Sequence, residues 1–268
     1  MWSEISAFNP WVVAVVLNSV LWSIASIVPK KLLTPSGYVH AWILGVLIWG
    51  CLGWRGYSIV MVYFLVGSAV TRIGMAEKEA AGIAEKRQGA RGPENVWGSA
   101  LTATLCAIGF VLFAWTLGVS PVSPSSSLPL PLYLLLLGYV ASFATKLSDT
   151  AASEVGKAYG KRTFLITTLQ PVPRGTEGAV SLEGTLAGVA ASILMALLGW
   201  GIGSIDALGA VWCVVAAFVA TNAESLIGAT LQDKFDWMTN EVVNFINTSI
   251  GAVVAMSIAF VWLSFQPF

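Results

Sequence analysis

The residues with the clearest capacity for chemistry lie in one polar segment, KLSDTAASEVGKAYGKRTFLITTLQPVPRGTEGAVSLEG, which runs from Lys146 to Gly184. If a helix continues past Lys146, three- and four-residue spacings bring one set of side chains to a single face. This face contains Lys146, Asp149, Ser153, Gly156 and Gly160. Small residues let a nucleotide or diphosphate approach the backbone, and Asp149 could hold a Mg²⁺ ion that bridges phosphate oxygens. The spacing therefore predicts a metal-phosphate site on this helix.

The second half of the same segment adds further charges. It contains Lys157 and Arg174, and two Glu-Gly pairs, Glu177-Gly178 and Glu183-Gly184, precede the next apolar run. Glu-Gly pairs near a helix start are also typical of capping and turns. We favour metal and phosphate binding, because charges beside a membrane are costly unless they have a function.

A second polar segment, RIGMAEKEAAGIAEKRQGARGPENVW, runs from Arg72 to Trp97. Its first part has the mixed charges of a solvated surface helix. Its second part combines glycines with Lys86, Arg87 and Arg91, followed by Asn95. Glycines beside arginines expose backbone N–H groups and guanidinium donors together, which favours a phosphate cradle.

A third polar segment, TNAESLIGATLQDKFDWMTNEVVNFIN, runs from Thr221 to Asn247. Glu224 lies at the expected end of an apolar helix, and Asn240, Asn244 and Asn247 share one face at the start of the next. Polar faces that enter a membrane helix either line a site or hold helices together. We therefore add Glu224 and Asn244 to the candidate site.

The elements that must position these residues are membrane helices. The chain has 56% hydrophobic and 10% charged residues, whereas a soluble domain has about 25% charged residues. Most of its apolar runs approach the ~20 residues that span hydrocarbon as a helix. These runs occupy about residues 11–28, 38–54, 57–71, 97–118, 131–145, 185–203, 207–223 and 243–263. We predict an all-α polytopic integral membrane protein of about eight transmembrane helices, forming a single domain over residues 1–268.

The charges are sorted between alternate connections. Of the 14 Lys and Arg residues, all except Arg55 fall in the odd-numbered connections, which makes those connections cytoplasmic by the positive-inside rule. All acidic residues except Glu4 and Asp206 sort in the same way. Topology alone explains the cations but not the carboxylates. We therefore place the catalytic loops, at about 72–96, 146–184 and 224–242, on the cytoplasmic face.

Other residue types narrow the chemistry. The single histidine, His40, argues against a histidine-rich zinc site or a Ser-His-Asp triad. The three cysteines lie inside apolar runs without CxxC spacing, so no disulfide framework or thiolate site is expected. The first apolar run begins near Trp11 without a basic region or a cleavage site, so we expect a retained first helix in a bacterial or mature chain.

Four motifs carry a resemblance to a known family. The run DTAASEVGKAYGK followed by SLEGTLAG resembles polyprenol and phytol kinases. The runs EKRQGARGPENVWG, PRGTEGAVSLEGTLAG and TNAESLIGATLQ are similar to the phytyl-phosphate kinases of the vitamin E pathway and their uncharacterised transmembrane relatives. The resemblance extends from about residue 67 onward. Alcohol kinases have Lys-Ser-x-Glu-Gly where this chain has Val180 to Gly184, so Arg174 or Lys157 is the candidate replacement for the lysine.

The resemblance implies conversion of phytyl phosphate to phytyl diphosphate with a nucleoside triphosphate, CTP being expected, and Mg²⁺, in salvage of phytol toward tocopherol and quinones. A phosphate monoester is already an anionic nucleophile, so such a kinase needs charge neutralisation more than a general base. The catalytic candidates are Asp149, Glu183, Arg174 and Lys146, and the metal candidates are Asp149, Glu183 and Glu177. The nucleotide- and phosphate-binding candidates are Lys86, Arg87, Arg91, Asn95, Ser153, Lys157, Glu177, Glu224 and Asn244.

Three alternatives stay open. An isoprenoid alcohol kinase or a lipid cytidylyltransferase would use the same metal and triphosphate groups. A transporter for an anionic lipid or metabolite would need ionisable residues or broken helices near the bilayer midplane, and no Asp, Glu, Lys or Arg lies in the middle of a predicted span. The expected partners are an isoprenoid phosphate and the membrane, without nucleic acid, and a homo-oligomer stays open. We expect the cytoplasmic or thylakoid membrane of a bacterium, in particular a cyanobacterium.

Overall fold

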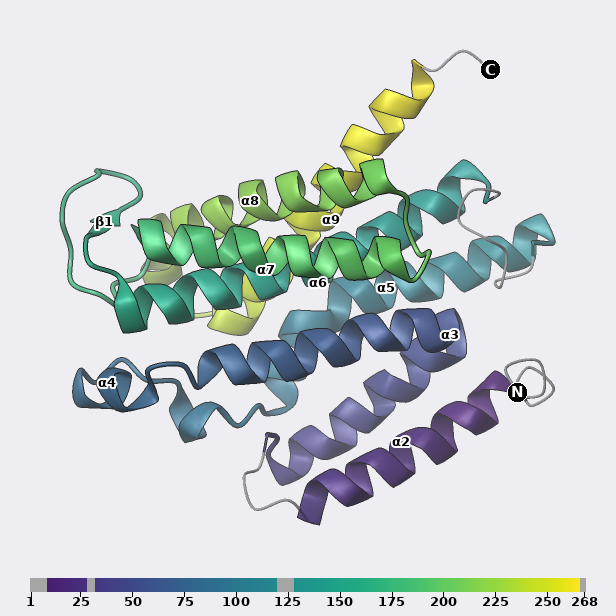
Figure 1. Cartoon of the computed structure of the whole chain (residues 1–268), viewed down its shortest axis with the longest axis horizontal. Coiled ribbons are helices and arrows are strands. Elements are labelled where there is room, and N and C mark those ends of the chain that lie inside the picture. Colours follow the sequence, from purple (N-terminus) through teal and green to yellow (C-terminus); the bar gives the residue numbers. More distant parts are fainter. Residues whose placement is uncertain (1–8, 28–31, 120–127, 266–268) are drawn as a thin grey trace.

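The computed structural model describes residues 9–27, 32–119 and 128–265, and these residues are mostly helical (Figure 1). The helices are α2 (Pro10–Ile27), α3 (Pro35–Thr71), α4 (Met75–Ala80), α5 (Pro93–Leu117), α6 (Leu130–Tyr159), α7 (Leu182–Gly201), α8 (Ala207–Thr230) and α9 (Asn240–Ser264). Two 3₁₀ turns, η1 (Lys86–Gly89) and η3 (Gln232–Lys234), and an antiparallel pair of strands, β1 (Thr163–Leu165) and β2 (Ala179–Ser181), lie between them.

Seven of the described helices are long and apolar enough to cross a membrane. One of them, α3, folds back on itself at Gly53, whose φ of 63° and ψ of −156° suit only glycine (Figure 1). The start and the end of α3 both contact Arg91. A Cβ added to Gly37, near the start, would lie 2.5 Å from the Arg91 carbonyl oxygen. A Cβ added to Gly67, near the end, would lie 2.8 Å from Arg91 Nη2. The two arms of α3 correspond to the predicted runs 38–54 and 57–71. The all-α polytopic membrane fold predicted from the sequence is therefore confirmed.

Helix α6 is the central helix, because α3, α5, α7, α8 and α9 all pack against it. It continues to Tyr159, well past the predicted span of 131–145. The helical continuation past Lys146 on which the sequence argument depended is therefore present. It carries the polar face of α6 into the charged end of the bundle.

Close packing of α6 against α7 depends on two glycines of α7 that are four residues apart. A Cβ on Gly184 would lie 2.5 Å from the carbonyl oxygen of Ala152, and one on Gly188 would lie 3.0 Å from that of Ser148. Both neighbours are backbone atoms of α6, so they can yield only if the helices move apart.

We expect Gly184→Ala to lower the free energy of unfolding by about 1–3 kcal/mol, the usual cost of overpacking a tight contact. Gly201→Ala in the same helix is the matched control, because a Cβ there meets nothing within 4 Å. The control should be neutral or slightly stabilising, since alanine is the better helix former. Thermal unfolding of the purified protein in detergent measures both, and equal destabilisation would contradict this account of the α6–α7 contact.

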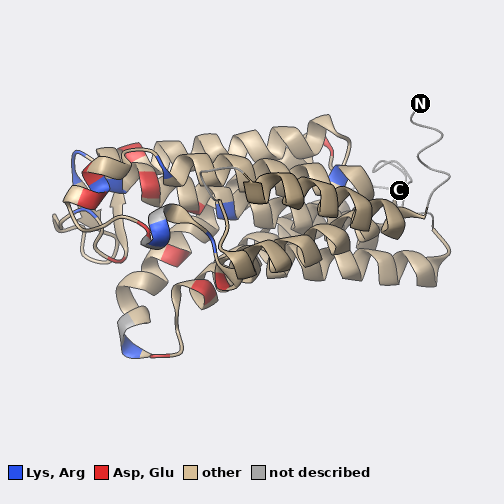
Figure 2. Ribbon diagram, turned by 90° about the horizontal axis from the view of Figure 1, so that it is seen from below, with Lys and Arg blue, Asp and Glu red and all other residues tan. Residues whose placement is uncertain are grey.

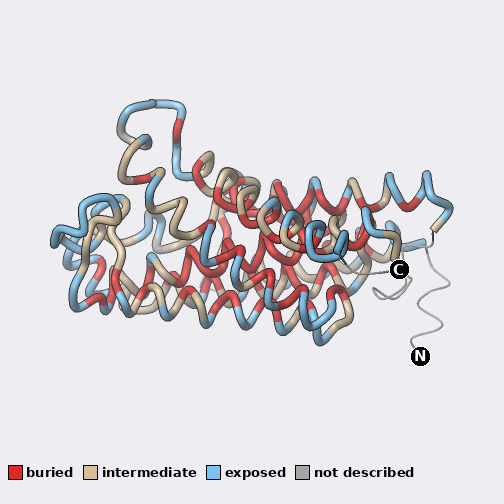
Figure 3. The backbone as a smooth tube through the Cα atoms, turned by 90° about the horizontal axis from the view of Figure 1, so that it is seen from above, coloured by how far each residue is buried: buried red, intermediate tan, exposed pale blue. Residues whose placement is uncertain are grey.

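Most charged residues lie at one end of the bundle, the end where α3 leads into α4 and α6 leads into β1 (Figure 2). At the opposite end, Arg55 follows the turn at Gly53, and Asp206 caps the start of α8 by accepting a hydrogen bond from Gly209 N. Lys30, Lys31 and Glu4 lie outside the described residues. Buried residues run along the middle of the bundle (Figure 3). Large apolar residues such as Leu112, Trp115 and Phe260 are exposed.

Candidate functional site

A polar cavity of about 520 Å³ opens at the charged end of the bundle. Its walls come from the end of α3, the 82–91 connection, the starts of α5, α7 and α9, the adjoining part of α6, residues 175–181 and the end of α8. The three polar segments singled out in the sequence therefore meet in one place. The sequence-predicted candidates that line this cavity are Arg87, Arg91, Asn95, Lys146, Asp149, Ser153, Lys157, Glu177, Glu224 and Asn244.

A buried cation lies among carboxylates in this cavity. Lys146 Nζ donates hydrogen bonds to Asp149 Oδ2 at 2.5 Å and to Asn244 Oδ1 at 2.6 Å. Lys146 and Asp149 are each only 7% exposed, so both charges depend on their protein partners rather than on water. The contact with Asn244 joins α6 to α9 and fixes the lysine at the inner side of the cavity.

Two further carboxylates approach this pair. The Glu224 carboxyl group, from α8, interacts with Asp149, Lys146 and Glu177. Glu177 comes close to α8 because its neighbour Gly178 has a φ of 74° and packs on the helix, where a Cβ would lie 2.4 Å from that of Ala229. Asp149 and Glu224 thus bring two carboxyl groups to one lysine, and Glu177 adds a third near Glu224.

Arg91 is held in the wall of the cavity by both backbone and side chain. Its N–H donates to the carbonyl of Leu32, and its carbonyl accepts from Thr34 N, each at 3.0 Å. Its guanidinium donates to the Tyr63 hydroxyl at 2.8 Å and stacks over the Tyr63 ring with Cζ 5.2 Å from the centroid. A guanidinium positioned in this way keeps free donors for a phosphate.

Arg87 and Asn95 also line the cavity. Arg87 pairs with Glu94, and both side chains are nearly half exposed, so this pair holds the arginine only weakly. Asn95 Oδ1 accepts a hydrogen bond from Gly92 N at 3.0 Å and so caps the start of α5. The side chain of Lys86, on η1, lies outside the described part of the structure.

Sequence reasoning missed a buried ion pair beside the cavity. Lys78 of α4 pairs with Glu154 of α6, and its Nζ also donates to the Thr71 carbonyl oxygen at 2.7 Å. Lys157 lies 3.9 Å from Glu154 and 3.8 Å from Glu85. The helical spacing of Glu154 from Lys157 could have revealed the acid. Lys78 gave no such signal, because the mixed charges around it indicated a solvated face, which is wrong for this residue.

Two candidates, Arg174 and Glu183, do not line the cavity. Arg174 Nη1 donates to the carbonyl oxygens of Ala158 at 2.8 Å and Lys157 at 3.5 Å, so it caps the C-terminal end of α6. Glu183 lies in the first turn of α7, where a negative charge is favourable. It is the next residue, Gly184, that faces α6. In both cases a helix end accounts for the charge.

The fold and the cavity define a polytopic integral membrane protein with a charged site at one end of its helical bundle. The chain belongs to the family described as Integral membrane protein DUF92, whose model matches residues 18–252. It is 64% identical to an uncharacterised membrane protein of Synechocystis sp. over 96% of this chain and 94% of the relative. It is 45% identical to Protein VTE6, chloroplastic, of Arabidopsis thaliana over 94% of this chain and 72% of the relative.

A more distant relative, an uncharacterised membrane protein of Methanocaldococcus jannaschii, is 30% identical over 85% of this chain and 87% of its own length. No solved structure matches the chain. The matches confirm the family that the four sequence motifs indicated.

Proposed function

We propose that this chain is a membrane-bound phosphotransferase that converts a prenyl monophosphate, phytyl phosphate in particular, to the diphosphate. The donor would be a nucleoside triphosphate, CTP being expected, used with Mg²⁺ at the cytoplasmic face. The observation that carries this proposal is the buried Lys146–Asp149 pair, with the Glu224 carboxyl group beside it, in a cavity that also contains Glu177 and Arg91. The family relation to Protein VTE6 supports the same substrate class.

The reaction needs little covalent help from the protein. An oxygen of the acceptor phosphate attacks the γ-phosphorus of the donor, a P–O bond forms, and the bond to the β-phosphate oxygen breaks to release the nucleoside diphosphate. An ionised monoester has no proton to lose at the attacking oxygen, so the cavity needs no general base. Its main task is to bring two polyanions together, which requires cations aimed at both.

The donor set of the cavity fits Mg²⁺. Among the described residues no three His, Cys, Asp or Glu side chains form a complete metal site. Mg²⁺ usually takes one or two carboxylates and completes its shell with waters and substrate phosphates. Asp149 with Glu224 supplies such a pair, and Glu177 lies nearby. Bound there, Mg²⁺ would neutralise phosphate charge and orient the donor.

The cations of the protein divide between two positions. Lys146 lies at the inner side of the cavity beside Asp149, where it would hold a transferred or bridging phosphate. Arg91 and Arg87 lie on the α5 side and Lys157 on α6, where they would hold the acceptor and the outer phosphates of the donor.

An isoprenoid alcohol kinase is the second candidate. A hydroxyl acceptor would have to lose a proton, and the buried Glu224 carboxyl beside Asp149 is a group that could take it. A lipid cytidylyltransferase would release diphosphate rather than a nucleoside diphosphate, so product analysis separates it from both kinases.

The test is an assay of the purified full chain in nanodiscs with phytyl phosphate or phytol, each nucleoside triphosphate and Mg²⁺. We expect phytyl diphosphate from phytyl phosphate, with CTP preferred, and loss of product when EDTA removes the metal. Restoring Mg²⁺ should restore activity, which separates metal removal from denaturation. Absence of diphosphate with every donor would overturn the proposal, and product from phytol alone would favour the alcohol kinase.

A further inference from the structure

We propose that the apolar pocket between α2, α3 and α5 holds the first part of the substrate's prenyl chain, with Arg91 at the boundary between phosphate and hydrocarbon. This inference rests on the proposed function, because the ligand is the same prenyl phosphate. It adds where the prenyl chain of the substrate lies, in which direction it runs from the phosphate, and which residues would select substrates by their prenyl chain.

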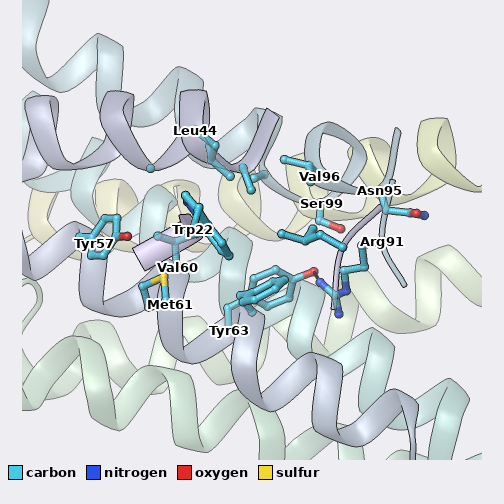
Figure 4. Close-up of a pocket in the computed structure, with 15 residues that line it drawn as sticks. Trp22, Leu44, Tyr57, Val60, Met61, Tyr63, Arg91, Asn95, Val96 and Ser99 are labelled. Atoms are coloured by element: carbon cyan, nitrogen blue, oxygen red, sulfur yellow. Dashed lines mark hydrogen bonds between the residues drawn. The ribbon is translucent and has the colours of Figure 1, made fainter. Parts of the chain in front are cut away.

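The pocket adjoins the polar cavity. Tyr63, Arg91, Asn95 and Ser99 line both. Figure 4 shows Arg91, Asn95 and Ser99 at one end of the pocket and Tyr57, Val60 and Met61 toward the other. A ligand with an anionic head and an apolar tail needs this change from polar to apolar walls over a short distance.

Beyond Arg91 the walls are almost wholly apolar. The remaining lining includes Trp22, Leu33, Leu44, Val60, Phe64 and Val96. Trp22 makes edge contacts with Tyr38 and Phe64, with ring centroids 5.9 and 5.6 Å apart. Such walls can replace the lipid around the prenyl carbons without exposing them to water.

The size of the pocket indicates a single slender chain. Tyr63 and Tyr57 are six residues apart on the second arm of α3, so the pocket follows that arm for roughly 9 Å at 1.5 Å per residue. Its cavity volume is only about 40 Å³, which suits at most one narrow hydrocarbon segment. A two-chain phospholipid would not fit, whereas a prenyl phosphate presents one chain next to its phosphate. The rest of a long chain would continue into the surrounding lipid.

Met61→Trp tests the pocket by filling it. We expect kcat/KM for phytyl phosphate to fall about tenfold, the usual scale for changes in a hydrophobic pocket, and that for a five-carbon prenyl phosphate to change less than twofold. Leu65→Trp is the matched control, because Leu65 lies on the same arm of α3, is 52% exposed and does not line the pocket. An equal loss for both chain lengths, or the same selectivity change in Leu65→Trp, would overturn the inference.

Photo-crosslinking of the wild-type chain tests the site without depending on turnover or on the folding of a variant. The probe is a prenyl phosphate with a diazirine on its first isoprene unit, and unlabelled phytyl phosphate is the competitor. We expect the probe to label peptides from α2, the second arm of α3 and the start of α5, and unlabelled phytyl phosphate to suppress this labelling. Such label without kinase activity would support the pocket while the proposed reaction failed. If the chain had kinase activity but the competitor-sensitive labelling fell only on α7, α8 or α9, the prenyl chain would not occupy this pocket, although the proposed reaction would stand.

Discussion

Asp149→Asn is expected to lower kcat for phosphorylation of phytyl phosphate by about 10²–10³-fold, the range found when one preorganised electrostatic group is removed from an active site. The substitution keeps the shape of the side chain but removes the charge that pairs with Lys146 and that would bind Mg²⁺. The concentration of Mg²⁺ needed for half-maximal activity should rise as well. Initial rates over a Mg²⁺ titration, with the purified chain in nanodiscs, give both values.

Glu183→Gln is the control for Asp149→Asn. Glu183 belongs to the same polar segment and was also a candidate metal ligand in the sequence, but it does not line the cavity. We expect its kcat and Mg²⁺ requirement to stay within about twofold of wild type, because only a favourable charge in the first turn of α7 is lost. If Glu183→Gln were as inactive as Asp149→Asn, the cavity would not be the catalytic site. Thermal unfolding of both variants shows whether either loss reflects misfolding.

These two acids show what the sequence could and could not predict. Asp149 was selected because a helix repeats its faces regularly, and α6, which continues without a break through Lys146, places it in the wall of the cavity. Glu183 and Arg174 were also chosen for their charge and position in the chain. However, helix ends also favour charged residues, and only the three-dimensional structure distinguishes a capping charge from one in a cavity. The membrane spans were easier to predict, because their length and hydropathy are local properties of the chain.

Contacts between distant segments account for most of what was missed. Tyr63 lies within an apolar run and resembled an ordinary membrane-helix aromatic, yet its hydroxyl accepts from Arg91, 28 residues away in the chain. Lys78 and Glu154 are separated by 76 residues, and α4 and α6 are brought together only by the complete bundle. Charge pairing over such separations leaves no periodic pattern in a single sequence.

Lys78→Met is expected to lower the free energy of unfolding by about 3 kcal/mol, the lower end of the 3–5 kcal/mol lost when one partner of a buried ion pair is removed. Lys78 is fully buried and Glu154 is 3% exposed, so the remaining carboxylate cannot be rehydrated in place. Lys157, 3.9 Å from Glu154, supplies part of the missing charge, which is why the lower end is expected. Thermal unfolding in detergent at constant protein and lipid concentration measures the loss.

The double variant Lys78→Met/Glu154→Leu distinguishes loss of charge pairing from loss of packing. Apolar replacement of both partners in a buried pair is often nearly neutral, so the double variant should recover most of the stability lost by Lys78→Met. Arg87→Met is the surface control: its pair with Glu94 is about half exposed, and its removal should cost less than about 1 kcal/mol. A double variant as unstable as Lys78→Met would mean that shape rather than charge joins α4 to α6. In that case the 82–91 connection, which carries Arg87 and Arg91 into the cavity, would be positioned by packing alone.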